Sequence, residues 1–169
     1  VLVTGGAGAI GSNLVRAIAG LGARSVVVLD DLSAAYRWNV PALPNVLFVE
    51  GSVTDEVVLK RVFNEEPEIV FHLGAQALVS TGYEDPVGTF VTNAIGTANV
   101  LEAALGEKDM RRVIDFSTSE VFGSHAFNVT EGDATALGAV GEARWTYAVS
   151  KLATEHLTFN YHKQFPPPI

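Results

Sequence analysis

The feature that most constrains the fold is the glycine-rich stretch at residues 1–12, VLVTGGAGAIGS. A short β-branched run leads directly into Gly5, Gly8 and Gly11, and an amphipathic segment follows. This order predicts a strand, a tight turn and the first turn of a helix. Glycine allows a left-handed turn and lets backbone N–H groups approach a ligand closely. Because a helix N-terminus carries unpaired N–H donors and partial positive charge, the turn suits a pyrophosphate group.

A second feature supports a dinucleotide site. Residues 25–29, SVVVL, form a continuous apolar run typical of a buried parallel strand, and Asp30 and Asp31 follow it. An acidic residue at the tip of the second strand can accept hydrogen bonds from the hydroxyls of an adenosine ribose. A 2′-phosphate would meet a carboxylate there, so the sequence favours NAD over NADP. The alternative is that the two aspartates only solubilise the strand end.

The composition fits a soluble α/β domain and excludes several classes of function. The net charge of −8 argues against nucleic acid or an anionic membrane surface as a partner, since both reward clustered Lys and Arg. No uninterrupted apolar run is long enough to span a bilayer. The lack of cysteine excludes disulfides and thiolate metal sites. With no contrary signal, we expect a cytoplasmic protein without a metal site.

The rest of the chain alternates strand and helix patterns, which is typical of a parallel sheet. The predicted fold class is α/β, a Rossmann-type doubly wound parallel sheet. The expected strands are 1–4, 25–30, 46–49, 68–73 and 112–116. The expected helices are 9–22, 56–65, 86–105 and 145–164. Thr54 or Asp55 is expected to cap the second helix, Pro86 fits the first turn of the third, and 118–143 is expected to be an irregular loop.

The two ends of the chain predict a piece of a longer protein. The sequence opens inside a strand without a methionine, and it closes on a proline run at 166–168, where another strand would be expected. We therefore expect residues 1–169 to be one NAD-binding domain, truncated before a sixth strand and a C-terminal substrate lobe. The last strand would then be an edge that the intact protein covers.

The residues best suited to chemistry follow the fifth predicted strand. Tyr147 and Lys151 are four residues apart, so they share one face of a helix. The Lys151 ammonium is expected to lower the pKa of Tyr147, which could then take a proton from a sugar hydroxyl. Thr118, at the carboxyl end of a strand, can hydrogen-bond the reacting oxygen. The alternatives are a solvent-exposed Tyr/Lys pair and ordinary turn chemistry for Thr118.

These motifs resemble the extended short-chain dehydrogenase/reductase family, which contains nucleotide-sugar epimerases, dehydratases and decarboxylases. The matching segments are TGGAGAIG at 4–11, HLGAQ at 72–76, NAIGTANVLEAA at 93–104, STSEVFG at 117–123 and YAVSK at 147–151. The resemblance implies Thr118, Tyr147 and Lys151 as the catalytic trio. It also implies a bound NAD that is recycled, a nucleotide-diphospho-sugar substrate, and a homodimer through the helices at 86–105 and 145–164.

The resemblance extends to the residues that contact the cofactor. Ser52 and Val53 stand where the family usually has Asp-Ile beside the adenine, and Phe122 stands where it usually has Tyr. The predicted cofactor-binding residues are Gly5, Gly8, Ala9, Ile10, Gly11, Asp30, Asp31, Ser52, Val53, Leu73, Gly74, Ala75, Asn93, Tyr147 and Lys151.

Glu120 bears on the type of reaction. The segment 118–120 resembles the Thr-x-Glu of sugar-nucleotide 4,6-dehydratases and UDP-glucuronate decarboxylases, and in dehydratases that Glu is the acid/base at C5 and C6. We therefore add Glu120 to the catalytic residues. The segment 72–76 resembles 4-epimerases more closely, so a UDP-sugar 4-epimerase is the alternative, and a non-catalytic NAD-binding sensor or scaffold is a further one. His72 itself is expected to be a hydrogen-bonded structural histidine.

Overall fold

The structure, a computed structural model, describes residues 1–124 and 126–165, so the proline run at 166–168 lies outside the described residues. One parallel sheet has the strand order β3–β2–β1–β4–β5. Its strands are β1 (Leu2–Thr4), β2 (Val26–Asp30), β3 (Val46–Glu50), β4 (Ile69–His72) and β5 (Arg112–Asp115). The strand order reverses between β1 and β4, and ligands of open α/β sheets bind at such a switch point. The predicted Rossmann-type fold is confirmed.

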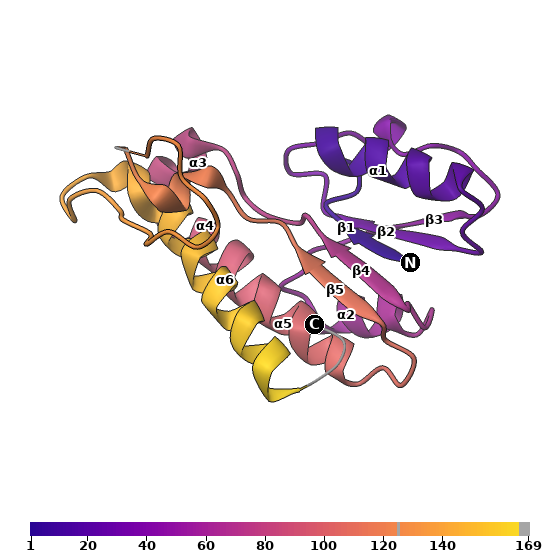
Figure 1. Ribbon diagram of the computed structural model, residues 1–169. Helices are drawn as coiled ribbons and strands as arrows, with labels where there is room; N and C mark the ends of the chain where they lie inside the picture. Colours follow the sequence, from indigo (N-terminus) through magenta and orange to yellow (C-terminus); the bar gives the residue numbers. More distant parts are fainter. Residues whose placement is uncertain (125, 166–169) are drawn as a thin grey trace.

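Helices cover both faces of this sheet (Figure 1). On one face, α1 (Ala9–Gly20) packs Val15 and Ala19 against strand residues such as Val28. On the other face lie α2 (Glu56–Phe63), α5 (Gly96–Leu105) and α6 (Thr146–Gln164), which share a larger core with the strands. Because both faces are covered, all five residues of β2 are buried, which explains its continuous apolar run.

The helix starts follow the predicted capping residues. Asp55 caps α2, since its carboxylate accepts hydrogen bonds from the backbone N–H groups of Val57 at 2.8 Å and Val58 at 3.2 Å. Pro86 opens α4 (Pro86–Phe90), where its missing N–H costs nothing. Asp85 precedes it and accepts from the backbone N–H of Gly88 at 2.8 Å.

The predicted helix at 86–105 is one helical run with an unusual turn inside it. Residues of α4 lead into η2 (Val91–Ile95), a π-helical turn, and α5 continues directly from there. A π turn holds one extra residue and is often found at functional sites. Here the turn carries Asn93, which is fully buried.

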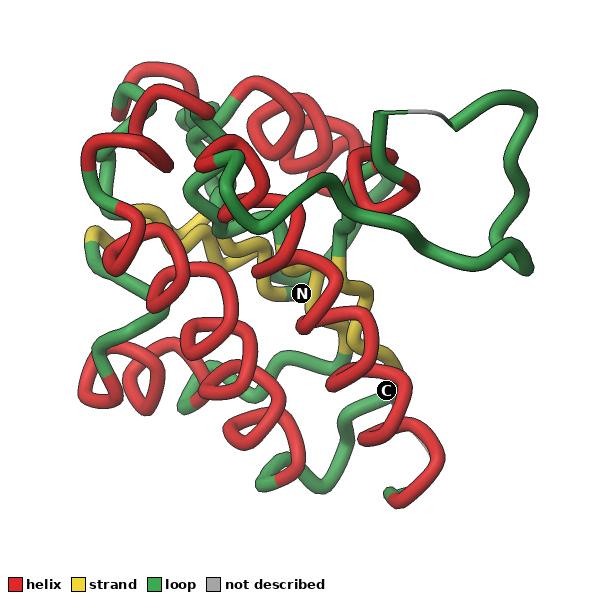
Figure 2. The backbone as a smooth tube through the Cα atoms, turned by 90° about the vertical axis from the view of Figure 1, so that its left-hand side faces the viewer, coloured by secondary structure: helices red, strands yellow, loops and turns green. Residues whose placement is uncertain are grey.

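Other differences from the predicted elements are local. A short helix, α3 (Val79–Glu84), was not predicted, and α1 and α2 each end two residues early. The segment 118–143 starts with η3 (Ser119–Phe122) and meets η4 (Ala143–Trp145), while most of it is a loop that extends away from the helices (Figure 2). Within residues 1–124 and 126–165, no helix has the length and apolar character that a bilayer crossing requires.

Candidate active site and cofactor crevice

The glycine turn is built from backbone packed against backbone. Gly5 has a left-handed φ of +66°, and its N–H donates to the carbonyl of Leu29 at 2.8 Å. A Cβ at Gly5 would lie 2.7 Å from the carbonyl carbon of Leu73, and a Cβ at Gly11 would overlap the carbonyl oxygen of Gly5. Gly5 is therefore required for both conformation and space, and Gly11 is required for space.

Asp30 holds this turn from the end of β2. Its side chain is buried, with Oδ2 accepting from the backbone N–H of Ala7 and Oδ1 from that of Leu32, both at 2.9 Å. The carbonyl of Ala7 accepts from Nδ2 of Asn39 at 2.9 Å. Asp31 is exposed and accepts from both the N–H and the hydroxyl of Ser33. The carboxylate predicted to meet a ribose thus also fixes the position of the turn.

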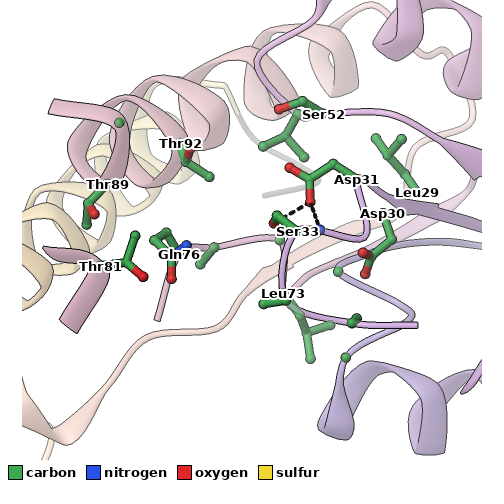
Figure 3. A pocket seen from close by; sticks show the side chains of 18 of the residues that line it. Leu29, Asp30, Asp31, Ser33, Ser52, Leu73, Gln76, Thr81, Thr89 and Thr92 are labelled. Carbon is green, nitrogen blue, oxygen red and sulfur yellow. Dashed lines mark hydrogen bonds between the residues drawn. The ribbon is translucent and has the colours of Figure 1, made fainter. Parts of the chain in front are cut away.

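A cavity of about 260 Å³ opens at the carboxyl ends of the strands (Figure 3). The carboxylates of Asp30 and Asp31 lie on one side of it, and Thr81, Thr89 and Gln76 lie on the other. Nine predicted cofactor residues line it: Gly5, Gly8, Asp30, Asp31, Ser52, Val53, Leu73, Gly74 and Ala75. The other predicted cofactor residues, which do not line it, are Ala9, Ile10, Gly11, Asn93, Tyr147 and Lys151.

This crevice fits the phosphate and ribose parts of a dinucleotide. Gly8 is the N-cap of α1 and has no side chain to satisfy the first N–H groups of that helix, which favours an anion there. At the position predicted for the adenine, the Ser52 hydroxyl lies 2.9 Å from that of Thr54 and also accepts from the Thr54 N–H at 3.2 Å. The position where the family usually carries a carboxylate is therefore a local hydroxyl turn in this chain.

His72 is at the centre of a hydrogen-bond chain between β1 and the central helical run. The Thr97 hydroxyl donates to the carbonyl of Asn93 at 2.6 Å, so it must accept from Nε2–H of His72 at 2.9 Å. The other ring nitrogen, Nδ1, then accepts from the Thr4 hydroxyl at 2.7 Å, which in turn accepts from the Gly74 N–H. Burial lowers the pKa of His72 to about 4. The prediction of a hydrogen-bonded structural histidine is confirmed.

Asn93 connects the loop after β4 to α6. Its Oδ1 accepts from the backbone N–H of Gln76 at 2.7 Å, and its Nδ2 donates to the Gln76 carbonyl at 3.1 Å and the Ser150 hydroxyl at 2.9 Å. The π turn is what directs this side chain inward. A contact between Asn93 and the cofactor stays a prediction, whereas its role in holding Ser150 follows from the geometry.

The structure brings together Tyr147, Thr118 and Glu120 at the carboxyl end of β5. The Thr118 hydroxyl accepts from the backbone N–H of Glu120 at 3.3 Å, and it lies close enough to the Tyr147 hydroxyl to act on the pKa of Tyr147. Thr118 therefore shows the turn chemistry that the sequence offered as the alternative, whereas its hydrogen bond to the reacting oxygen stays a prediction. Burial raises the pKa of Tyr147, the carboxylates of Glu120 and Asp115 raise it further, and the Thr118 hydrogen bond opposes them.

Lys151 differs from the sequence-based prediction. Its Nζ lies 3.4 Å from Oδ1 of Asp115, and the exposed side-chain fractions are 2% for Lys151 and 6% for Asp115. The expectation that Lys151 lowers the pKa of Tyr147 is wrong for this structure, because Asp115 holds the ammonium and the Tyr147 pKa is raised. Asp115 itself was missed; an acidic residue at the last position of a buried strand was the available signal.

The chain belongs to the NAD dependent epimerase/dehydratase family, whose model matches residues 1–167. It is 34% identical, over 98% of its length, to a UDP-N-acetyl-alpha-D-glucosaminuronate decarboxylase of Bacillus cytotoxicus, of which it covers 51%. It is 32% identical, over 99% of its length, to a dTDP-glucose 4,6-dehydratase of Xanthomonas campestris, of which it covers 50%.

Solved structures agree. The UDP-glucose 4-epimerase of Brucella ovis in complex with NAD has a TM-score of 0.83 and 31% identity over 97% of this chain and 48% of that one. The prediction of NAD as the family's cofactor is confirmed. The chain spans about half the length of the curated relatives it matches.

Proposed function

We propose that the full-length protein uses NAD to oxidise C4 of a nucleotide-linked hexose and then returns the hydride to the sugar intermediate, and that residues 1–169 are its cofactor-binding domain. The observation that carries this proposal is the convergence of Tyr147, Thr118 and Glu120 at the carboxyl end of β5, where the Thr118 hydroxyl and the Glu120 carboxylate both act on the pKa of Tyr147. A substrate lobe beyond this chain is supported by the exposed edge of β5 and by relatives of about twice its length. The acidic, cysteine-free composition supports a cytoplasmic location.

The cofactor would lie along the crevice, with its pyrophosphate at the glycine turn and its adenosine ribose at Asp30. When bound, NAD supplies the hydride acceptor and a positively charged ring. The residues that we assign to its binding are the fifteen predicted from the sequence. Nine of these line the cavity described above.

Tyr147 would act as the general base toward the hydroxyl at C4 of the sugar. The Thr118 hydroxyl lowers the pKa of Tyr147, and its oxygen accepts from the Glu120 N–H. When a sugar hydroxyl enters, Thr118 can donate to that oxygen while Tyr147 removes its proton. Because the pKa of Tyr147 is raised, the phenol keeps its proton near neutral pH unless positive charge approaches.

Glu120 would carry the step after oxidation. Its Oε2 is buried and has no hydrogen-bond partner among the described residues, and its charge raises the pKa of Tyr147. A carboxylate so placed can exchange protons with a 4-keto sugar. We therefore favour a 4,6-dehydratase or a decarboxylase, with a UDP-sugar 4-epimerase as the alternative, supported by the Brucella ovis structure.

A single-turnover measurement of NADH absorbance tests this function. The full-length protein is mixed with UDP-, dTDP- and GDP-sugars, and we expect one of them to reduce the bound NAD. In a dehydratase, Glu120→Gln should still form NADH and then accumulate it, because product formation stops. In an epimerase the same change should be mild. If no sugar reduces NAD, the non-catalytic sensor or scaffold becomes the better reading.

We also propose a homodimer through the helical run 86–105 and α6. Val91, Ile95 and Val149 on these helices are between about a third and a half exposed, and Leu152 is partly buried beside them. Burying such apolar side chains in a four-helix interface would stabilise the pair. Sedimentation tests the proposal, and a monomer of the full-length protein at micromolar concentration would contradict it.

A further inference from the structure

Asp115 places a second charged group beside the catalytic lysine. It ends β5, where it pairs in register with His72 of β4. Its Oδ1 faces Nζ of Lys151 at 3.4 Å, and both side chains are withdrawn from solvent. Its Oδ2 has no hydrogen-bond partner within the described part of the chain.

Stability alone does not account for this pair. Burying two charges costs several kcal/mol per ion, and apolar residues of similar volume are often at least as stable. His72 cannot satisfy the second carboxylate oxygen, because Thr4 and Thr97 already occupy both of its ring nitrogens. A carboxylate that is costly and only partly satisfied calls for a role in the site.

We infer that Asp115 is a positioning residue of the active site, which anchors the Lys151 ammonium at the end of β5, one helical turn beyond Tyr147. This inference rests on the proposed function. It assigns Asp115 to hold the lysine and to balance its charge, and it leaves proton transfer to Tyr147.

The charges around Tyr147 determine whether replacing Asp115 raises or lowers the pKa of Tyr147. The charged groups that act on its pKa are Glu120 on η3 and Asp115 on β5, and Asp115 is paired with Lys151 on α6. Both carboxylates raise the pKa of Tyr147. Replacing Asp115 by Asn removes one of them and leaves the ammonium without its counter-ion. Both changes favour the phenolate, so the pKa of Tyr147 should fall while the geometry of Lys151 is loosened.

Spectrophotometric titration of tyrosinate absorbance in the full-length protein tests the electrostatic part without requiring turnover. Each protein is compared with its own Tyr147→Phe counterpart, so that the difference isolates Tyr147. We expect Asp115→Asn to titrate Tyr147 at lower pH, and Asp115→Glu, which keeps the charge, to titrate it near the unmutated position. Asp109→Asn, an exposed change before the amino end of β5, is the matched control and should not move it.

Single-turnover hydride transfer tests the positioning part. At a pH above the Tyr147 transition, Asp115→Asn should be slower by about tenfold or more, because small misplacements of catalytic groups cost this much. Binding of the nucleotide sugar should be unchanged, and Asp115→Glu should recover part of the rate. An unmoved Tyr147 titration together with an unchanged plateau rate would overturn the inference. If the unmutated protein reduces no NAD, the proposed function fails, while the titration still decides the electrostatic role of Asp115.

Discussion

The glycine turn and the catalytic end of the domain, which is the cluster of Tyr147, Thr118, Glu120 and Asp115 after β5, are built by different physical means. The glycine turn is shaped by steric fit, and Asp30 and Asn39 hold the backbone of Ala7 on both sides. The catalytic end is shaped by charged side chains from separate elements, and the buried Oδ2 of Asp115 and Oε2 of Glu120 have no partner among the described residues. The turn is therefore rigid as it stands, whereas the electrostatics of the catalytic end depend on what binds there.

The largest effect is expected from a substitution at the catalytic end that leaves the glycine turn unchanged. Tyr147→Phe removes the proposed base, so hydride transfer should slow by about 10²–10⁴-fold, as for general-base removal in other enzymes. NAD binding, measured by calorimetry, should fall by a much smaller factor, because Tyr147 is only one of the fifteen residues assigned to it. Tyr83→Phe, which removes a hydroxyl from an exposed tyrosine, is the control. Reduction of NAD by Tyr147→Phe at the unmutated rate would end the proposal.

A substitution in the glycine turn should instead lower the stability of the protein and its NAD binding. Gly5→Ala forces a left-handed φ on alanine and drives its Cβ into Leu73, so we expect a loss of about 2 kcal/mol or more in the free energy of unfolding. NAD binding should be lost with it. Gly20→Ala is the matched control, since nothing lies within 4 Å of the new Cβ at this helix end. Denaturant unfolding measures the free energy of unfolding, and calorimetry measures NAD binding. Equal effects of Gly5→Ala and Gly20→Ala would contradict the steric explanation of the turn.

The chain through His72 lies between the two ends and should give the protein an acid-sensitive stability. The pKa of His72 is about 4 in the folded protein, below its ordinary value of 6.5. Between these two pH values the unfolded chain therefore binds more protons than the folded protein. The stabilisation is complete above pH 6.5 and is lost as pH falls toward 4, roughly 3 kcal/mol in all.

His72→Gln should remove this pH dependence of the free energy of unfolding, measured by urea denaturation at each pH. His156→Gln, at an exposed position of α6, should keep it. A pH profile that His72→Gln leaves unaltered would show that the imidazole is not the group that titrates.

The smallest effect concerns cofactor choice. Asp30→Ala should weaken NAD binding by about 1–3 kcal/mol, because hydrogen bonds to a charged group are lost. Asp30 also accepts a hydrogen bond from the Ala7 N–H, so the substitution should loosen the glycine turn. A looser turn should weaken the binding of NAD and NADP equally. The ratio of the two dissociation constants therefore reports the contact with the ribose alone. That ratio should move toward one. Equal or tighter NADP binding by the unmutated protein would contradict the assignment of Asp30.

Local sequence was enough to predict the parts of the molecule that depend on neighbouring residues. The buried strands follow from continuous apolar runs, and the turn at Gly5 follows from glycine spacing. In contrast, α3 was missed because residues 79–84, VSTGYE, mix β-branched residues with a glycine and show no clear helical period.

The catalytic end was predicted in composition but not in detail. The i,i+4 spacing places Tyr147 and Lys151 on one face, yet spacing cannot say toward which group a long side chain turns. Lys151 turns to Asp115, which lies 36 residues away in the sequence. Only the packing of α6 against β5 brings these two charges together, and no local pattern encodes that distance.

The π turn at Val91–Ile95 also limits how this chain can tolerate changes in length. A π turn is equivalent to one residue inserted into an α-helix, so deleting a residue there would restore regular winding. The two parts of the helix would then rotate by about 100° relative to each other, because one α-helical residue corresponds to that angle. If Val100 and Leu101 stayed packed in the core, Asn93 would lose its hydrogen bonds to Gln76 and Ser150. The segment 91–95 should therefore accept substitutions far more readily than a deletion.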